Sequence, residues 1–351
     1  MAYDLTNATT LSGLINQNLP RRPWLFRKFF TPKYHDTLQI AVDIVSGTKK
    51  LAPFRREGEE STVKSSIGTT TKFFGPNQIS IKNLTKAFDL KKRAAGQQFS
   101  YGDGVKTVED RIAFKLGQEL TDMTNRIYQT IEKMCAEALY NDEVNNYDAN
   151  GNVIETFSIG LADDHKVTRT SSAAWNQSGA TILEDIDDWC NIVETDSALP
   201  ATDVILGAGA KNALRRNDKV LKQLSTNTAK FALIDPQKKE AGGQFLGYTS
   251  DGVRLWCCTE TYENSAGSKT AMIPDDKVIV LSNEMAANVH FGLIEDIEAG
   301  GFVGEIFSKT WETKDPSGIW LKAASAPLAL VSQPSALVVA DVMYGADGLP
   351  G

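Results

Sequence analysis

Several features that direct a functional assignment are missing from this 351-residue sequence. No apolar run approaches the roughly 20 residues that a membrane-spanning helix needs, and residues 1–4 do not open a basic segment followed by an apolar one. We therefore expect a protein that is made and kept in the cytosol. The cysteines show neither C-x-x-C spacing nor the density of a disulfide-rich domain. We expect them to be reduced and mostly structural: Cys135, Cys190, Cys257 and Cys258.

Catalytic and ligand-binding motifs are also scarce. Gly207 and Gly209 begin a dinucleotide fingerprint, but Asn212 stands where the third glycine belongs, so we predict only a tight strand-to-helix connection. The turn at Asp148 lacks the glutamate that a calcium loop places at its twelfth position, which is Ile159. The scattered histidines form no short-range metal motif: His35, His165 and His290. We predict no catalytic residue, no cofactor and no metal site.

Charge is distributed unevenly along the chain, although the net value is only −7. Residues 1–95 contain 16 lysines and arginines against 7 acidic residues, whereas residues 96–351 contain 21 against 37. The first part is therefore electrostatically complementary to the second. Three interpretations remain open: a basic arm for nucleic acid, a basic segment that docks on the acidic body of another copy, or a solvated loop without a partner.

A compact group of aromatic residues lies between prolines near the N-terminus. Prolines at positions 20, 23 and 32 interrupt helices there, and clustered aromatic rings supply a large area for burial. This pattern predicts an arm that docks on another surface, with packing into the core of the same chain as the alternative. The aromatic members are Trp24, Phe26, Phe29 and Phe30.

Residues 36–95 have the pattern of a long hairpin. Apolar residues alternate with polar ones over residues 37–44, and glycines and prolines then break the chain. An isolated two-stranded hairpin is marginally stable in water, so this extension needs a partner. Its central part is too polar to be buried in its own core and includes Lys49, Lys50, Arg55, Arg56, Glu59 and Lys64.

The clearest helix follows a plausible cap at Thr107. Apolar residues recur in steps of three and four from Val108 to Ala138, which places one stripe along about nine helical turns. The steps average about 3.75 residues, whereas a heptad coiled coil needs an average of 3.5, so a coiled coil is disfavoured. We therefore predict one rod roughly 50 Å long.

The remaining chain predicts a mixed α/β region and closing strands. A turn at 145–152 leads into a strand at 153–159. Helical patterns occupy 182–193 and 210–224, and strand patterns occupy 203–206, 253–258, 278–281, 319–331 and 337–342.

Four short stretches carry a resemblance to a known family. They are Leu25 to Phe30, Phe74 to Lys82, Pro274 to Val278, and Ser325 to Leu330 with Pro334 behind it. With the order arm, basic hairpin, long helix, α/β region and closing strands, the chain resembles the lambda-type major capsid proteins of tailed bacteriophages, which have the Hong Kong 97-type capsid fold.

The resemblance implies an α+β fold with an N-terminal arm, an extended β-hairpin loop, a long spine helix in a peripheral domain, and a mixed α/β axial domain. The implied parts are the arm at 1–35, the extended loop at 36–105, the spine helix and peripheral strands at 106–159, the axial domain at 160–300, and the closing peripheral and axial strands at 301–351.

The resemblance further implies a non-enzymatic protein that assembles into hexamers and pentamers, which form an icosahedral head around double-stranded DNA. The protein would then be found in the virion after assembly in the host bacterial cytoplasm. A portal protein at one vertex, an outer decoration protein, a separate scaffolding protein and weak non-specific DNA contact complete the expected partners, with no membrane. Arm and loop residues would contact neighbouring subunits, with hinges at Gly96, Gly102 and Gly104.

Two alternatives remain open. An encapsulin-type nanocompartment shell shares the fold but encloses enzymes instead of a genome, and the Ser325 to Leu328 ending favours the phage protein. A soluble α/β enzyme that uses residues 160–300 would instead be a monomer or small oligomer with a defined pocket.

Overall fold

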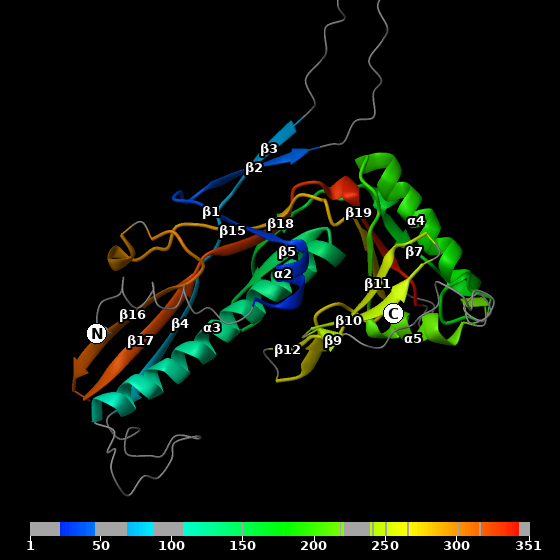
Figure 1. The fold of residues 1–351 in the computed structure, drawn as a ribbon. Coiled ribbons are helices and arrows are strands. Elements are labelled where there is room, and N and C mark those ends of the chain that lie inside the picture. Colours follow the sequence, from blue (N-terminus) through cyan, green and yellow to red (C-terminus); the bar gives the residue numbers. More distant parts are fainter. Residues whose placement is uncertain are drawn as a thin grey trace, which may run out of the picture.

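The computed structural model shows two lobes joined by a short N-terminal helix (Figure 1). An elongated lobe carries the longest helix, and a second lobe carries a twisted sheet with helices on one face (Figure 1). The structure describes residues 22–45, 69–86, 108–148, 150–177, 179–217, 219–220, 239–240, 242–249, 251–264, 267–300, 302–315 and 317–343.

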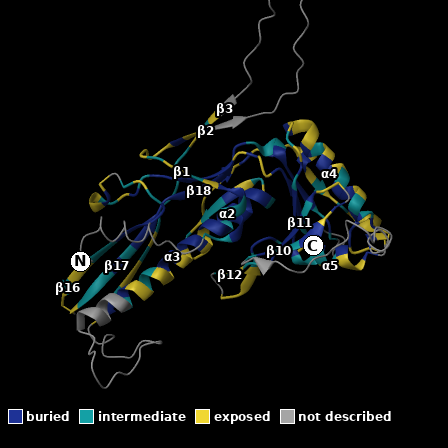
Figure 2. Ribbon diagram, in the orientation of Figure 1, coloured by how far each residue is buried: buried dark blue, intermediate teal, exposed yellow. Residues whose placement is uncertain are grey.

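The predicted long helix is confirmed as α3 (Val108–Tyr140), with 33 residues. At about 1.5 Å per residue its length is close to 50 Å. The apolar stripe faces the core, because Met123, Ile127 and Ile131 are almost inaccessible to solvent. Figure 2 shows that burial deepens toward the C-terminal end of the helix, where the two lobes meet.

Two three-stranded sheets accompany α3 in the elongated lobe. One has the order β16–β17–β4 and the other β1–β15–β18. Alternate residues of β17, such as Leu321 and Ala323, turn toward α3 and join its core. Their bounds are β1 (Thr31–Tyr34), β4 (Ile79–Lys86), β15 (Ala287–Phe291), β16 (Phe307–Lys314), β17 (Ser317–Ser325) and β18 (Pro327–Val331).

The strand pattern predicted over 319–331 is confirmed, and it forms two strands that belong to different sheets. The break falls at Ala326, between β17 and β18. Proline has no backbone N–H to donate to a sheet ladder, and Pro327 accordingly occupies the first position of β18.

The second lobe contains a seven-stranded mixed sheet in the order β7–β19–β14–β8–β11–β10–β9. All four residues of β8 are buried, as its unbroken apolar run predicts. The strands are β7 (Lys166–Thr168), β8 (Asp203–Leu206), β9 (Lys239–Glu240), β10 (Gly243–Tyr248), β11 (Arg254–Cys258), β14 (Lys277–Leu281) and β19 (Leu337–Asp341).

Alternate residues of this sheet face two different cores. Val204 and Val278 pack with helices α4 (Ile182–Ser197) and α5 (Ala208–Arg216), whereas Ile205 and Ile279 join the core that contains α3. The sheet is therefore covered on both sides. The division of the chain into domains stays a prediction. Strand β15 lies within residues 160–300, the predicted axial domain, and it pairs with β1 and β18 of the elongated lobe.

The helix predicted over 210–224 is shorter than expected, since α5 ends at Arg216. Asn217 leaves the helix with extended backbone, and its side-chain oxygen accepts hydrogen bonds from the amides of Lys219 and Val220. Such a cap begins a new turn instead of continuing the helix. Residues 221–224 lie outside the described part.

Smaller elements complete the fold. They are α2 (Trp24–Phe29), β2 (Ile40–Val45), β3 (Thr69–Phe74), β5 (Glu143–Tyr147), β6 (Val153–Ser158), β12 (Thr261–Glu263), β13 (Lys269–Ala271), and the 3₁₀ turns η2 (Asp163–His165), η3 (Ser171–Ala173), η4 (Ile297–Ala299) and η5 (Pro334–Ala336).

Candidate assembly surfaces

The predicted hairpin is confirmed at its base, where β2 and β3 form a two-stranded antiparallel ladder. One face turns inward, with Ile40 and Val42 buried and the ring of Phe74 at 5.7 Å from that of Phe157 in β6. The other face exposes Phe73, which is 70% accessible. In the described part of the chain neither outer edge of this ladder pairs with a third strand. The ladder thus offers both backbone and apolar groups to another surface.

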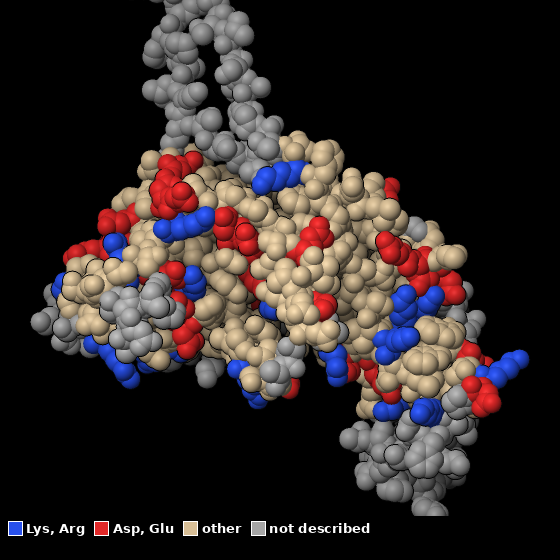
Figure 3. Space-filling model, turned by 180° about the vertical axis from the view of Figure 1, so that it is seen from behind, with Lys and Arg blue, Asp and Glu red and all other residues tan. Residues whose placement is uncertain are grey.

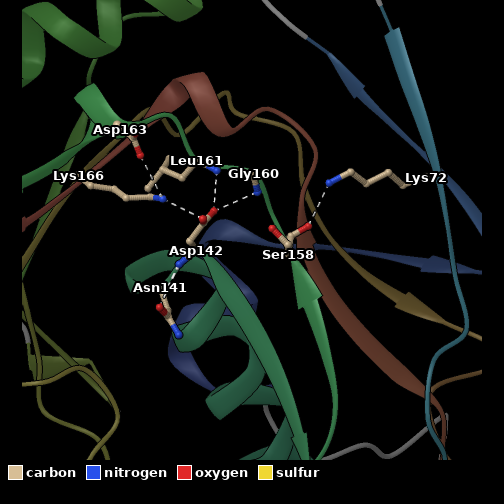
Figure 4. Close-up of polar contacts among 8 residues, drawn as sticks. All are labelled: Lys72, Asn141, Asp142, Ser158, Gly160, Leu161, Asp163 and Lys166. Atoms are coloured by element: carbon tan, nitrogen blue, oxygen red, sulfur yellow. Dashed lines mark hydrogen bonds and ion pairs between the residues drawn. The ribbon is translucent and has the colours of Figure 1, made fainter.

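The base of the ladder is fastened to the β5–β6 hairpin. The Lys72 ammonium donates to the Ser158 carbonyl oxygen at 3.4 Å, and the two groups face each other in Figure 4. Nearby, the Asn77 amide donates to the Glu155 carboxylate at 2.9 Å. Ile154 on the same hairpin is 63% exposed. The extension therefore leaves the body from a defined position beside a second exposed apolar group.

A carboxylate after the end of α3 holds the connection between the lobes (Figure 4). Asp142 accepts hydrogen bonds from the amides of Gly160 at 3.0 Å and Leu161 at 2.6 Å, and from the Lys166 ammonium at 2.8 Å. Partial burial disfavours the charged form, but the Lys166 and Leu161 bonds outweigh it and lower the pKa of Asp142. Gly160 has φ +82, a conformation that favours glycine.

The aromatic residues of the arm lie in the core of their own chain. Trp24 and Phe26 have no accessible surface, and Phe29 and Phe30 are also buried. Their short helix α2 is capped by Glu132, whose carboxylate accepts from the amides of Leu25 and Phe26 at 2.6 and 3.0 Å. This placement is the core-packing alternative that the sequence left open, and it leaves Trp24 and Phe26 no surface for a neighbour.

A second buried carboxylate joins the arm to the elongated lobe. Glu305, 2% exposed, pairs with Arg22 and accepts from the hydroxyls of Tyr34 at 2.9 Å and Tyr128 at 2.7 Å. Burial and the nearby carboxylate raise the pKa of Tyr34 to about 12. Both tyrosines therefore remain hydrogen-bond donors at neutral pH.

The Lys28 side chain connects the arm to the second lobe. Its ammonium lies 2.8 Å from the centroid of the Trp256 ring and 3.7 Å from a carboxylate oxygen of Asp203. Asp203 is fully buried and also accepts from Arg254 and from the Trp256 indole N–H. In Figure 1, α2 accordingly sits where the two lobes meet.

Two of the histidines meet, which no sequence motif indicated. His35 Nε2 and His290 Nδ1 are 2.9 Å apart, with stacked rings beside the β1–β15 pair. Burial is the main cause that lowers the pKa of His290 to about 4, and the charges of His35 and Lys33 lower it further. Because the two histidines are 255 positions apart, only the parallel pairing of β1 with β15 brings them together.

The G-x-G segment, the Asp148 turn and the cysteines, for which the sequence predicted no ligand, have structural roles. A methyl group at Gly209 would stand 2.8 Å from the Asp275 carbonyl oxygen, so the G-x-G segment is a tight connection from β8 to α5. Asp148 accepts from the amides of Asn150 and Asn152, as a turn residue does. All four cysteines are free and buried, which fits the structural role predicted for Cys257 and Cys258.

The remaining predicted site residues belong to the hairpin tip and the hinges. The charged positions of the hairpin tip and the three glycine hinges lie outside the described residues: Lys49, Lys50, Arg55, Arg56, Glu59, Lys64, Gly96, Gly102 and Gly104.

A comparison with protein families decides the assignment. The sequence model for phage major capsid protein E matches residues 7–342. The chain belongs to this family. It is a major capsid protein of a tailed phage, as the resemblance implied, and the family match favours this function over the encapsulin and enzyme alternatives. A comparison with curated proteins gives no match by sequence.

Solved structures confirm the fold of this capsid protein. A protein described as a prophage capsid protein of E. coli CFT073 superposes with a TM-score of 0.71 at 16% identity, over 96% of this chain and 99% of that one. A phage-related protein from Bordetella bronchiseptica RB50 has a TM-score of 0.57 at 13% identity, over 97% and 98%. The Hong Kong 97-type capsid fold is therefore confirmed. Among the described helices, none is long and apolar enough to cross a membrane.

Proposed function

We propose that this capsid protein assembles into hexamers and pentamers that close an icosahedral head around the double-stranded DNA of a tailed phage. The observation that carries this proposal is the β2–β3 ladder, whose two strands have no further partner among the described residues and whose outer face exposes Phe73. A two-stranded ladder gains little stability by itself, so a neighbouring subunit is its natural support. The protein acts by assembly, without catalysis.

The charged part of the extension would dock on the neighbour. Residues 1–95 carry the excess of basic groups and residues 96–351 the excess of acidic groups, which favours contact between the extension of one copy and the body of the next. The proposed contacts are Lys49, Lys50, Arg55, Arg56, Glu59 and Lys64, with Gly96, Gly102 and Gly104 as hinges for the different positions in a closed shell.

DNA contact would be weak and non-specific. On the face shown in Figure 3, acidic and basic side chains are interspersed, and the described residues form no continuous basic area there. Strong phosphate binding needs clustered lysine and arginine, so the genome would be confined more than bound. A portal protein at one vertex, an outer decoration protein and a separate scaffolding protein are the other proposed partners, with assembly in the bacterial cytoplasm.

The first experiment is to express the chain alone and analyse it by size-exclusion chromatography and negative-stain electron microscopy. Closed shells or capsomer rings support the proposal. A discrete monomer that remains one after a scaffolding protein is supplied contradicts it. Nuclease treatment of particles from infected cells distinguishes a phage head from a nanocompartment, since only the head contains protected double-stranded DNA.

Phe73→Ser tests the surface directly. Burying a phenylalanine contributes about 1.5–3 kcal/mol, so losing this contact would raise the concentration needed for assembly by roughly tenfold or more. Ile297→Ser is the matched control, because Ile297 is 100% exposed and belongs to η4, outside the two strands of the ladder. An equal effect of both variants would mean that the ladder has no special part in assembly.

A further inference from the structure

Outside the surfaces described above, three metal-ligating side chains converge at the connection between the lobes. Ligand atoms of Asp164, His165 and Asp196 all lie within 4.8 Å of one another. The first two residues come from η2, directly before edge strand β7, and Asp196 comes from the last turn of α4. Figure 4 shows the flanking residues Asp163 and Lys166, with Lys166 directed toward Asp142.

The orientation of the His165 ring carries the argument. The ring is buried, with 2% of the residue exposed, and its Nδ1 lies 2.7 Å from the Leu337 carbonyl oxygen. A carbonyl oxygen only accepts, so Nδ1 must carry the proton, and the lone pair of a neutral ring is then on Nε2. This nitrogen faces Asp196 Oδ2 at 3.0 Å, which is also an acceptor.

A second proton on Nε2 would make this contact an ion pair with Asp196. A metal ion bound to both atoms from the open side of the site is the other way to satisfy two facing acceptors. Metal-ligating histidines almost always donate their second ring N–H to a carboxylate, carbonyl or water, as His165 does to Leu337. Asp164 then adds a second carboxylate oxygen, which a proton alone does not use.

We propose that Asp164, His165 and Asp196 form a binding site for a divalent transition-metal cation such as Zn²⁺. An imidazole nitrogen with carboxylate oxygens suits Zn²⁺, whereas Mg²⁺ favours oxygen ligands alone. Bonds of about 2.0–2.2 Å bring any two ligand atoms within about 4.4 Å of each other, so the exposed side chains of Asp164 and Asp196 would close around the ion; the Asp196 side chain is 41% exposed. The exposed side of the site leaves the remaining coordination positions to water.

Such an ion would tie α4 to the connection between the lobes. That connection is already held from its other side, because Lys166 and the amides of Gly160 and Leu161 bind Asp142. With the metal bound, η2 would be fixed on both sides. The ion would thereby restrict movement of the second lobe relative to α3.

The cysteines do not compete for Zn²⁺. The cysteines are buried, and desolvation raises the pKa of Cys190 and of Cys258 to about 12, so neither offers a thiolate at neutral pH. Among the described residues, Asp164, His165 and Asp196 are the one group of three such side chains whose ligand atoms lie this close together.

The test is titration of Zn²⁺ into the full chain, purified without an affinity tag, treated with chelator and kept in excess Mg²⁺. We expect one equivalent to bind, with a rise in melting temperature. Asp196→Asn and His165→Gln should each weaken binding by at least about 100-fold, since removal even of an outer partner costs 10–100-fold. Asp163→Asn is the matched control, because this neighbouring acid is fully exposed and outside the ligand set.

Co²⁺ provides a readout that does not depend on stability. Its visible absorption should report nitrogen and oxygen ligation in the wild-type chain and change in Asp164→Asn, an exposed position where misfolding is not expected. Absence of saturable Zn²⁺ binding in the wild-type chain would overturn the proposal. So would unchanged affinity in Asp196→Asn, because the ion would then bind elsewhere.

Discussion

Replacing Gly243 by alanine tests whether α2 fixes the two lobes to each other. The Trp24 indole lies directly over the Gly243 backbone, and a methyl group there would overlap the indole ring. Gly243 is absent from the residues with positive φ, so alanine is allowed by the backbone, and the three atoms nearest to the added methyl group all belong to Trp24. Trp24 is fully buried and cannot move aside without displacing its neighbours.

The size of the effect follows from packing. Overpacking a filled core costs about 1–3 kcal/mol. Trp24→Ala costs about 3–5 kcal/mol by itself, but it empties the space that the alanine methyl would fill. In the Trp24→Ala background, Gly243→Ala should therefore be close to neutral. The coupling energy between the two positions should be about 1–3 kcal/mol.

Urea denaturation of the unassembled chain, followed by far-ultraviolet circular dichroism, gives the free energies of the four species. Hydrogen–deuterium exchange of residues 22–30 gives the local opening of α2, which Gly243→Ala should accelerate by roughly 5- to 150-fold. Gly117→Ala is the control: it lies in α3 with open space around it, so it should stabilise by up to about 1 kcal/mol. Equal costs of Gly243→Ala with and without Trp24 would refute the argument.

Three further predictions concern assembly and pH. Deleting residues 48–66 should abolish shells and leave a folded monomer, and electron microscopy that still shows intact shells would exclude docking of the tip. Exchanging Arg55 and Arg56 for glutamate should weaken assembly most at low salt, since exposed charges are screened within about 8 Å at physiological salt; light scattering at several salt concentrations measures this, and equal assembly at every salt would mean that the charges are only solvated. Lowering the pH from 6.5 to about 4 should destabilise the chain by up to about 3 kcal/mol, because over this range the unfolded chain binds a proton that buried His290 does not. Urea midpoints in His290→Leu should lose this part of the pH dependence, and an unchanged pH profile would show that His290 titrates normally.

Local periodicity predicted the elements whose own residues determine them. The α3 stripe and the apolar run of β8 were found because their burial repeats along the sequence. The contacts between distant segments could not be predicted in this way, because no local pattern shows that Glu132 caps α2 or that Glu305 binds Arg22. The aromatic arm shows the same limit: its sequence indicates burial, but only the fold shows that the covering surface belongs to the same chain.

The strands that anchor the extended loop have a consequence for the order of events during translation. Before the loop, β1 pairs with β15, and after it, β4 pairs with β17. At about 5–20 residues per second, roughly 10 to 50 s separate synthesis of β4 from synthesis of β17. Until then the base of the loop has its contacts with the β5–β6 hairpin, but the flanking strand β4 still lacks its sheet partner on the ribosome-bound chain. A nascent subunit therefore presents its extension in the final position only after β17 is made, which delays productive association until each chain is nearly complete.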